Sequence, residues 1–187
     1  MAVTHAVVLA ATRAWLERAV IGLNLCPFAK AVLAKGQVHF AVSDADSAAQ
    51  ALHDLGRELD ALLAHDPEER ETTLLVVAHG MQQFLEFNDL VADGERLIRK
   101  KGHEGVIQLA SFHPDYCFAD QDDGDMANFS NRSPYPTLHL LREASVERAV
   151  QAFPEPESIY GANIRTLRDL GPEGWAALNA GVDHQSR

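Results

Sequence analysis

The alternation of apolar and polar residues switches between a helical and a strand period along the chain, and these switches separate the predicted elements. Apolar residues recur every three or four positions over residues 4–23, which is the period of an amphipathic helix. The same period predicts two further helices over residues 48–62 and 82–101. Shorter helices are expected over residues 27–35, 146–153, 158–170 and 172–179.

Three short apolar runs predict strands at residues 38–42, 73–78 and 106–112. The second run has little polar alternation, as expected of a strand that is covered on both faces. Because helices separate the three strands, we expect them to run in the same direction. Residues 137–142 predict either a fourth strand, antiparallel at an edge of the sheet, or the opening of a helix, and we favour the strand.

These elements predict a single α/β domain over residues 1–187. Its expected architecture is a mainly parallel sheet of three to four strands with helices packed on it. A possible antiparallel edge strand and helical segments at the N- and C-terminal ends complete the prediction. With 47% hydrophobic residues, the chain has enough apolar surface to form its own core.

The charge balance excludes two classes of partner. The chain carries 16 basic and 27 acidic residues, a net charge of −11, which opposes binding to nucleic acid and to anionic membranes. No apolar stretch approaches the roughly 18 residues that a membrane span needs. Two cysteines are too few for a disulfide scaffold, and no basic segment precedes the first apolar run. We therefore expect a cytoplasmic protein, and the pattern leaves its oligomeric state open.

Candidate chemistry gathers where strands end. Ligands of parallel sheets bind beyond the carboxyl ends of the strands, and those ends carry His79, His113 and Asp115. His113 is a candidate acid–base group and Asp115 its partner, although a histidine at a strand end often only caps carbonyl groups. Cys26 is a candidate nucleophile, since Pro27 predicts a helix start that would make Cys26 its N-cap. The alternative for Cys26 is a packing role.

The predicted loop over residues 113–136 is long, and long loops in compact domains are often functional. Its closing stretch contains Asn131, Arg132, Ser133 and Tyr135, which we take as candidate substrate-binding residues. The planar guanidinium group of arginine suits a carboxylate or a phosphate, so Arg132, or Arg142 further on, would anchor an anion. A salt bridge to a nearby aspartate is the alternative for Arg132.

His139 is compatible with two roles. On a strand or on a helix it shares a face with Glu143, so the two side chains can act together. His139 is therefore a further catalytic candidate, and His113, His139 and Glu143 are candidate metal ligands. The spacing matches no established metal motif, and the pattern leaves any cofactor unknown.

Three separated segments carry a resemblance to a known family: GLNLCPFA at residues 22–29, SFHPDY at residues 111–116 and NRSPYP at residues 131–136. With the following residues 139–143, they resemble the bacterial family catalogued as domain of unknown function 1415. The likeness runs over residues 15–170. It implies a bacterial origin and cytosolic residence, and it transfers no catalytic role. Cys117 departs from the polar residue that we associate with this place in the family.

Three functional hypotheses follow from these candidates. The first is an enzyme that acts on a small anionic metabolite through acid–base or thiol chemistry. The second is a metal-dependent enzyme or metal-binding protein that uses His113, His139 and a carboxylate. The third is a non-catalytic binding module whose aromatic-rich loop docks a partner. A shared cavity of Cys26, His113, Arg132 and His139 would favour the first.

Overall fold

A computed structural model describes residues 4–153, 155 and 158–181 of the chain. The strands are β1 (Val38–Ser43), β2 (Thr72–Val77), β3 (Ile107–Phe112) and β4 (Thr137–Arg142). The α-helices are α1 (His5–Trp15), α2 (Ala29–Ala34), α3 (Ala48–Ala64), α4 (Phe84–Lys100), α5 (Glu143–Gln151) and α6 (Ser158–Ala177). A π-helix, η1 (Leu16–Ile21), and a 3-10 helix, η2 (Met126–Ser130), complete the elements.

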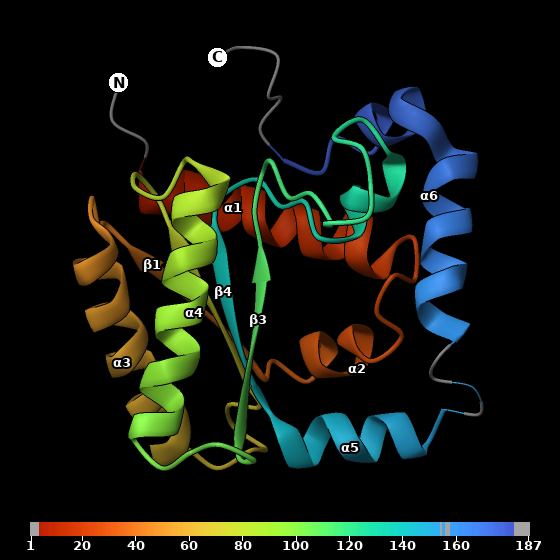
Figure 1. Cartoon of the computed structure of the whole chain (residues 1–187). Helices are drawn as coiled ribbons and strands as arrows, with labels where there is room; N and C mark the ends of the chain where they lie inside the picture. The colour runs from red at the N-terminus through yellow and green to blue at the C-terminus, as the bar shows by residue number, and fades with distance from the viewer. Residues whose placement is uncertain (1–3, 154, 156–157, 182–187) are drawn as a thin grey trace.

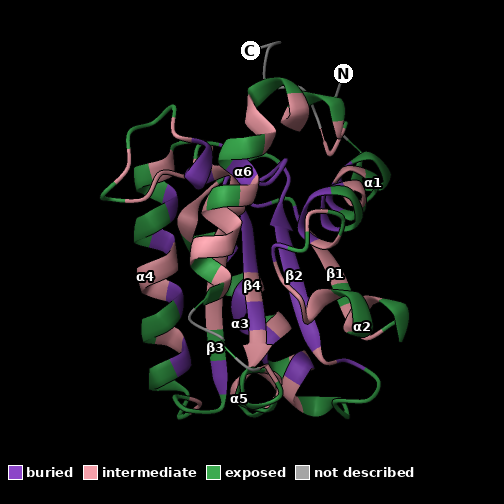
Figure 2. Cartoon of the chain, turned by 90° about the vertical axis from the view of Figure 1, so that its right-hand side faces the viewer, coloured by how far each residue is buried: buried purple, intermediate pink, exposed green. Residues whose placement is uncertain are grey.

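The four strands form one sheet in the order β1-β2-β4-β3. Strands β1 and β2 pair in parallel, whereas β4 is antiparallel to both of its neighbours. The first three strands therefore run in the same direction, and residues 137–142 form an antiparallel strand, as the sequence predicts. The expected position of β4 at an edge is wrong, because it lies between β2 and β3 (Figure 2). One of the three strand pairings is parallel, so the sheet is mixed.

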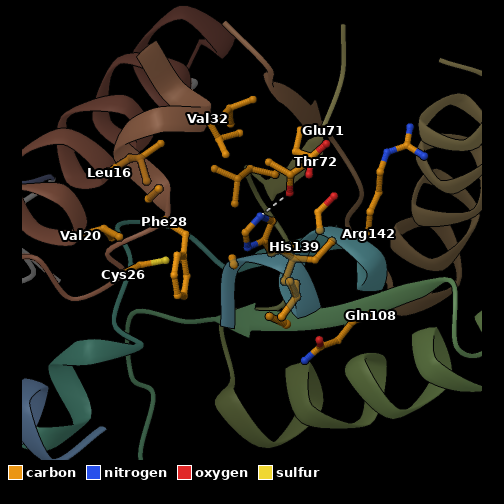
Figure 3. A pocket seen from close by; sticks show the side chains of 18 of the residues that line it. Leu16, Val20, Cys26, Phe28, Val32, Glu71, Thr72, Gln108, His139 and Arg142 are labelled. Carbon is orange, nitrogen blue, oxygen red and sulfur yellow. Dashed lines mark hydrogen bonds between the residues drawn. The ribbon is translucent and has the colours of Figure 1, made fainter. Parts of the chain in front are cut away.

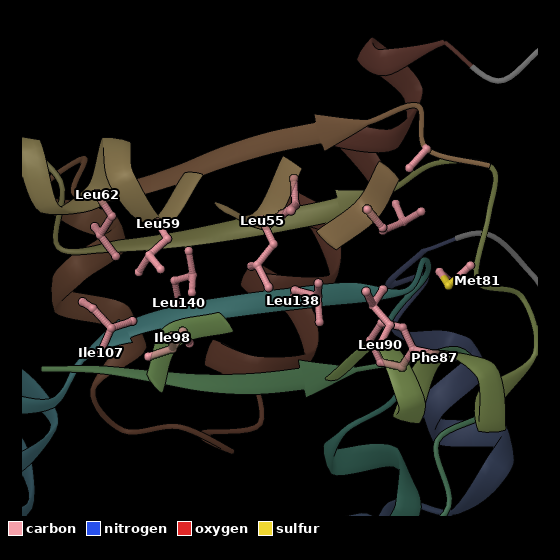
Figure 4. Packing of buried hydrophobic residues seen from close by; sticks show 14 residues of the cluster. Leu55, Leu59, Leu62, Met81, Phe87, Leu90, Ile98, Ile107, Leu138 and Leu140 are labelled. Atoms are coloured by element: carbon pink, nitrogen blue, oxygen red, sulfur yellow. The ribbon is translucent and has the colours of Figure 1, made fainter. Parts of the chain in front are cut away.

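Helices α3 and α4 cover one face of the sheet and bury the main core against it (Figure 1). Strand alternation directs Leu138 and Leu140 of β4 to this face, where both are fully buried. Figure 4 shows Leu55 and Leu59 of α3 packed against them. Replacing one of these buried leucines by alanine typically lowers the free energy of unfolding by about 2–5 kcal/mol. This layer therefore stabilises the sheet that positions the site.

The other face of the sheet carries α1 and α2, and α5 lies across one end of the strands (Figures 1 and 2). The single helix expected over residues 4–23 is an α-helix that continues as the π-helix η1. In η1 the N–H of Gly22 donates to the carbonyl of Glu17, the wider spacing of a π-turn. Leu16 and Val20 of this segment are buried against the sheet.

Two sequence predictions at helix ends have different outcomes. Gly171 has a φ of 66° inside α6, so the helix breaks there, as predicted from the Gly-Pro pair. The predicted helix start at Pro27 is wrong, because α2 begins at Ala29 with Phe28 as its N-cap. Cys26 therefore lies in the turn before the helix and caps nothing with its side chain. Among the described residues, no helix is both long and apolar enough to cross a membrane.

Candidate functional site

A cavity of about 340 Å³ lies between the second face of the sheet and the segments α1, η1, α2 and α5. Its lining is mostly aliphatic and aromatic, and it includes Trp15, Phe28 and Phe112. The polar residues that line it are Glu71, Thr72, Gln108, His139, Arg142 and Ser145. A volume in this range is sufficient for a small organic ligand.

The alternation of the central strands forms the floor of the cavity. Leu74, His139 and Ala110 are partners in register across β2, β4 and β3, so their side chains point to the same face. The small side chain of Ala110 leaves space beside the imidazole ring of His139. The main core lies on the opposite face, so α3 and α4 do not fill this space.

The hydrogen bonds of Thr72 determine which ring nitrogen of His139 carries the proton. The hydroxyl of Thr72 lies 2.6 Å from the carbonyl oxygen of Leu140 and 2.6 Å from Nε2 of His139. A carbonyl only accepts, so the hydroxyl donates to Leu140, and Nε2 of His139 must donate to the hydroxyl. Burial lowers the pKa of His139 to about 4, so the ring is neutral near pH 7. Its second nitrogen, Nδ1, is therefore a hydrogen-bond acceptor.

Cys26 lines the same cavity, on the side formed by the turn before α2 (Figure 3). Cys26 and His139 thus share one cavity, as the first hypothesis requires of them. Cys117 is remote from it, in the long loop, where its thiol contacts the carbonyl oxygens of Phe118 and Gln121. Partial burial and the carboxylate of Asp123 raise the pKa of Cys117, which opposes a thiolate there.

Arg142, for which the sequence suggested the role of anion anchor, bonds to backbone carbonyl groups. Its side chain leaves the cavity and extends toward the end of α3 (Figure 3). There Nη2 lies 2.7 Å from the carbonyl oxygen of Leu62 and 2.8 Å from that of His65. Because these carbonyls end α3, Arg142 caps the helix and is not directed at a ligand.

The structure places His113, the predicted acid–base residue, outside the cavity that Cys26 and His139 line. The ring is fully buried on the α4 side of the sheet and lines none of the cavities described here. Its Nδ1 accepts from the backbone N–H of Asp115 at 3.0 Å, and its Nε2 lies 2.9 Å from the carbonyl oxygen of Met81. Both nitrogens therefore serve the backbone, and His113 joins the end of β3 to the turn at Met81.

Arg132, a candidate substrate-binding residue of the long loop, bonds to the backbone of that loop. Arg132 donates from Nε to the carbonyl of Tyr116 and from Nη2 to that of Asp123, and its guanidinium carbon lies 4.4 Å from the ring centroid of Phe129. The salt bridge considered for Arg132 is replaced by these backbone contacts. Such contacts to carbonyls far apart along the chain stabilise one loop conformation.

Two other candidates of this loop, Ser133 and Asn131, also bond to the backbone, and a third, Tyr135, is buried. The hydroxyl of Ser133 donates to the carbonyl of Tyr135, and the amide of Asn131 donates to the carbonyl of Ser111. The ring of Tyr135 is buried against the N-terminal helix. Asp115, Arg132 and Ser133 line a second cavity of about 290 Å³, between the loop and the end of α6. The sequence candidates are therefore divided between two cavities.

The metal set proposed from the sequence is not assembled. His113 lies on the α4 face and His139 on the opposite face of the sheet, so the two imidazoles do not converge. Glu143 begins α5 and borders a shallow depression with Gln108 and Glu147. Within the described part of the chain, no group of three or more His, Cys, Asp or Glu residues is placed to hold a metal ion.

Sequence reasoning missed Thr72 and Ala110. Thr72 orients the imidazole of His139, and Ala110 leaves the space beside it. The available signal was the period-two alternation, which places Thr72 on the same face as Leu74. That signal becomes informative only when the strand order β2-β4-β3 is known, because the strand order makes these residues neighbours.

The fold and this site define an α/β protein with an apolar cavity on one face of a mixed four-stranded sheet. The chain matches the model of the family described as Protein of unknown function (DUF1415) over residues 7–177, and it belongs to this family. The resemblance carried by the three sequence segments is thereby confirmed. No curated protein and no solved structure matches the chain.

Proposed function

We propose that this protein binds a mainly apolar small molecule in the cavity above β2, β4 and β3. The observation that carries the proposal is the cavity of about 340 Å³, whose mostly aliphatic and aromatic lining includes one neutral imidazole. A dry apolar cavity of about 150 Å³ is already large enough to bind benzene in an engineered protein. The cavity of this chain, at about 340 Å³, has room for a ligand of two or three aromatic rings.

This proposal replaces the anionic ligand suggested by the sequence with an uncharged one. Arg142 is the one basic residue in the lining, and its Nη2 is directed to carbonyl groups of the protein. The net charge of −11 adds a field that disfavours an anion. An uncharged ligand avoids the cost of removing a charge from water without a partner.

Binding is better supported than acid–base catalysis. An effective general base has a pKa near the working pH, whereas the pKa of His139 is lowered to about 4. The acid–base enzyme is therefore the weaker proposal, and a thiol reaction at Cys26 is the form of it that the cavity still accommodates. The loop-docking module has less support, because the loop lines a concave cavity with Asp115 and Arg132.

We also propose that the protein works in the bacterial cytoplasm. The two cysteines are free thiols, which fits a reducing compartment. The acidic charge balance supports a protein that binds neither nucleic acid nor anionic membrane surfaces.

Filling the cavity should abolish binding of an apolar dye. We expect N-phenylnaphthylamine, which is uncharged, to gain fluorescence with the wild type, and the variant Ala110→Phe to weaken its binding at least about tenfold, or ~1.4 kcal/mol. The reason is steric, since Ala110 lies on the floor beside His139. Fluorescence titration measures the effect.

The matched control is Ala144→Phe, the same substitution at an exposed alanine of α5 that is outside this cavity. Ala144→Phe should bind the dye as the wild type does. If Ala110→Phe unfolds, Ala149→Phe fills the cavity from the α5 side. Equal affinity of the wild type and both folded cavity variants would contradict the proposed function.

Cys26 gives an independent reporter of occupancy. In a Cys117→Ser background, Cys26 is the one remaining cysteine of the chain, and its side chain lines the cavity. Saturating N-phenylnaphthylamine should slow its alkylation by N-ethylmaleimide roughly tenfold, because the ligand excludes the reagent. Mass spectrometry of the modified protein over time measures the rate. An unchanged rate at saturating dye would locate the dye elsewhere.

A further inference from the structure

The polar contacts inside the cavity indicate which polar group the ligand carries. This inference rests on the cavity being the ligand site proposed above. The relevant atom is Nδ1 of His139. Thr72 fixes the ring with its proton on Nε2, because the hydroxyl of Thr72 is already a donor to the carbonyl of Leu140. The lone pair of Nδ1 therefore faces away from the Thr72 contact.

Nδ1 is reached from the cavity. Its side of the ring faces Phe28 and Cys26, whereas Nε2 faces Thr72 (Figure 3). Among the described residues, one side-chain nitrogen or oxygen atom is both sealed from solvent and without a hydrogen-bond partner, and it is Nε of Arg142. Nδ1 of His139 is not such an atom. Within the described part of the chain, the one hydrogen bond of the His139 ring is at Nε2. Nδ1 is thus an acceptor left for whatever fills the cavity.

The surroundings make this acceptor selective. Leu16, Val20 and Val32 line the cavity on the side of Cys26, and none offers a hydrogen-bond donor. A ligand that displaces water from Nδ1 without donating to it leaves a desolvated acceptor, which costs free energy. A ligand of the same shape with an N–H or O–H group avoids this cost.

We infer that the cavity selects apolar ring compounds that carry an N–H or O–H donor, and that Nδ1 of His139 accepts that donor. The ligand class is therefore an uncharged aromatic amine, phenol or indole-like molecule. Thr72 is a positioning residue in this scheme, since it fixes the orientation and tautomer of the ring.

The test compares indole with indene, which has the same fused-ring shape and a CH₂ group in place of the N–H. We expect the wild type to bind indole about ten to a hundred times more tightly than indene. In His139→Phe this preference should fall to less than about threefold, with the affinity for indene kept or raised. Isothermal titration calorimetry measures both ligands.

His53→Phe provides the matched control, because His53 is an exposed histidine of α3 outside the cavity. It should keep the preference for indole. If His139→Phe does not fold, nitrogen NMR of the wild type tests the same contact, since Nδ1 should be hydrogen-bonded with indole and lose its hydrogen bond with indene, which gives two different Nδ1 resonances.

The possible results separate the two proposals. Equal binding of indole and indene to the wild type would overturn the selection by His139 and leave the apolar cavity as the ligand site. A preference that persists in folded His139→Phe would also overturn it, because another acceptor would then be responsible. Binding of neither compound, together with failure of the dye and alkylation experiments, would overturn the proposed function itself.

Discussion

Replacing His113 by alanine is expected to lower the free energy of unfolding by roughly 3–5 kcal/mol. The substitution empties a fully buried site between the rings of Phe84 and Phe87. It also leaves the N–H of Asp115 and the carbonyl of Met81 without the imidazole partner that each has now. Chemical denaturation followed by circular dichroism measures the loss.

The cost is expected to be high because Met81 has a φ of 59°, in the left-handed region that non-glycine residues seldom adopt. The hydrogen bond from His113 helps to hold this turn. His53→Ala on the exposed surface of α3 should change stability by less than about 0.5 kcal/mol. A loss below about 1 kcal/mol for His113→Ala would show that His113 does not have this structural role.

Acidification from pH 6.5 to 4 is expected to remove roughly 3 kcal/mol of stability through His139 alone. Burial lowers the pKa of His139 from its ordinary 6.5 to about 4 in the folded protein. As the pH falls, the unfolded chain therefore takes up this proton before the folded chain does. The stabilisation is complete above pH 6.5 and is lost as the pH falls toward 4.

The comparison of wild type with His139→Phe isolates this contribution. Between pH 6.5 and 4, the unfolding free energy of the variant should fall less steeply by up to about 1.4 kcal/mol per pH unit. Burial and the charge of Arg70 also lower the pKa of His39, and this contribution is common to both proteins. Parallel curves for the two proteins, measured by denaturant titration at each pH, would disprove the buried neutral state of His139.

The two histidines lie on opposite faces of the sheet and have different surroundings. His113 is enclosed on the face that α3 and α4 cover, and its two nitrogens satisfy backbone groups. His139 is on the face with the cavity, where we propose that its Nδ1 accepts a hydrogen bond from a ligand. A stability experiment therefore addresses the first residue, and a binding experiment addresses the second.

Local pattern was sufficient for most of the elements. The apolar run that includes Leu74–Val77 predicted a buried strand because a strand covered on both faces needs no polar alternation. The Gly171-Pro172 pair predicted a break because glycine adopts positive φ and proline suits the start of a helix. The three segments quoted above identified the family. The start of α2 was misplaced because Pro27 is equally suited to the preceding turn.

The site candidates were predicted less well than the elements. Cys26 and His139 line the cavity, whereas His113, Arg132 and Arg142 bond mainly to the backbone. Residue type alone does not distinguish these outcomes, since the same guanidinium group serves an anion or a carbonyl oxygen. The choice depends on which groups the folded chain brings within about 3 Å.

By itself, the sequence determined the α/β class, the direction of the first three strands and the family, because these depend on local periodicity and on short motifs. Only the tertiary structure decided that β4 lies between β2 and β3, with the long loop joining β3 to this adjacent antiparallel strand. That order makes Leu74, His139 and Ala110 neighbours, whereas side-chain alternation places His113 and His139 on opposite faces. The physical reason is that side-chain alternation assigns residues to a face, whereas long-range packing decides which face is filled and which retains a cavity.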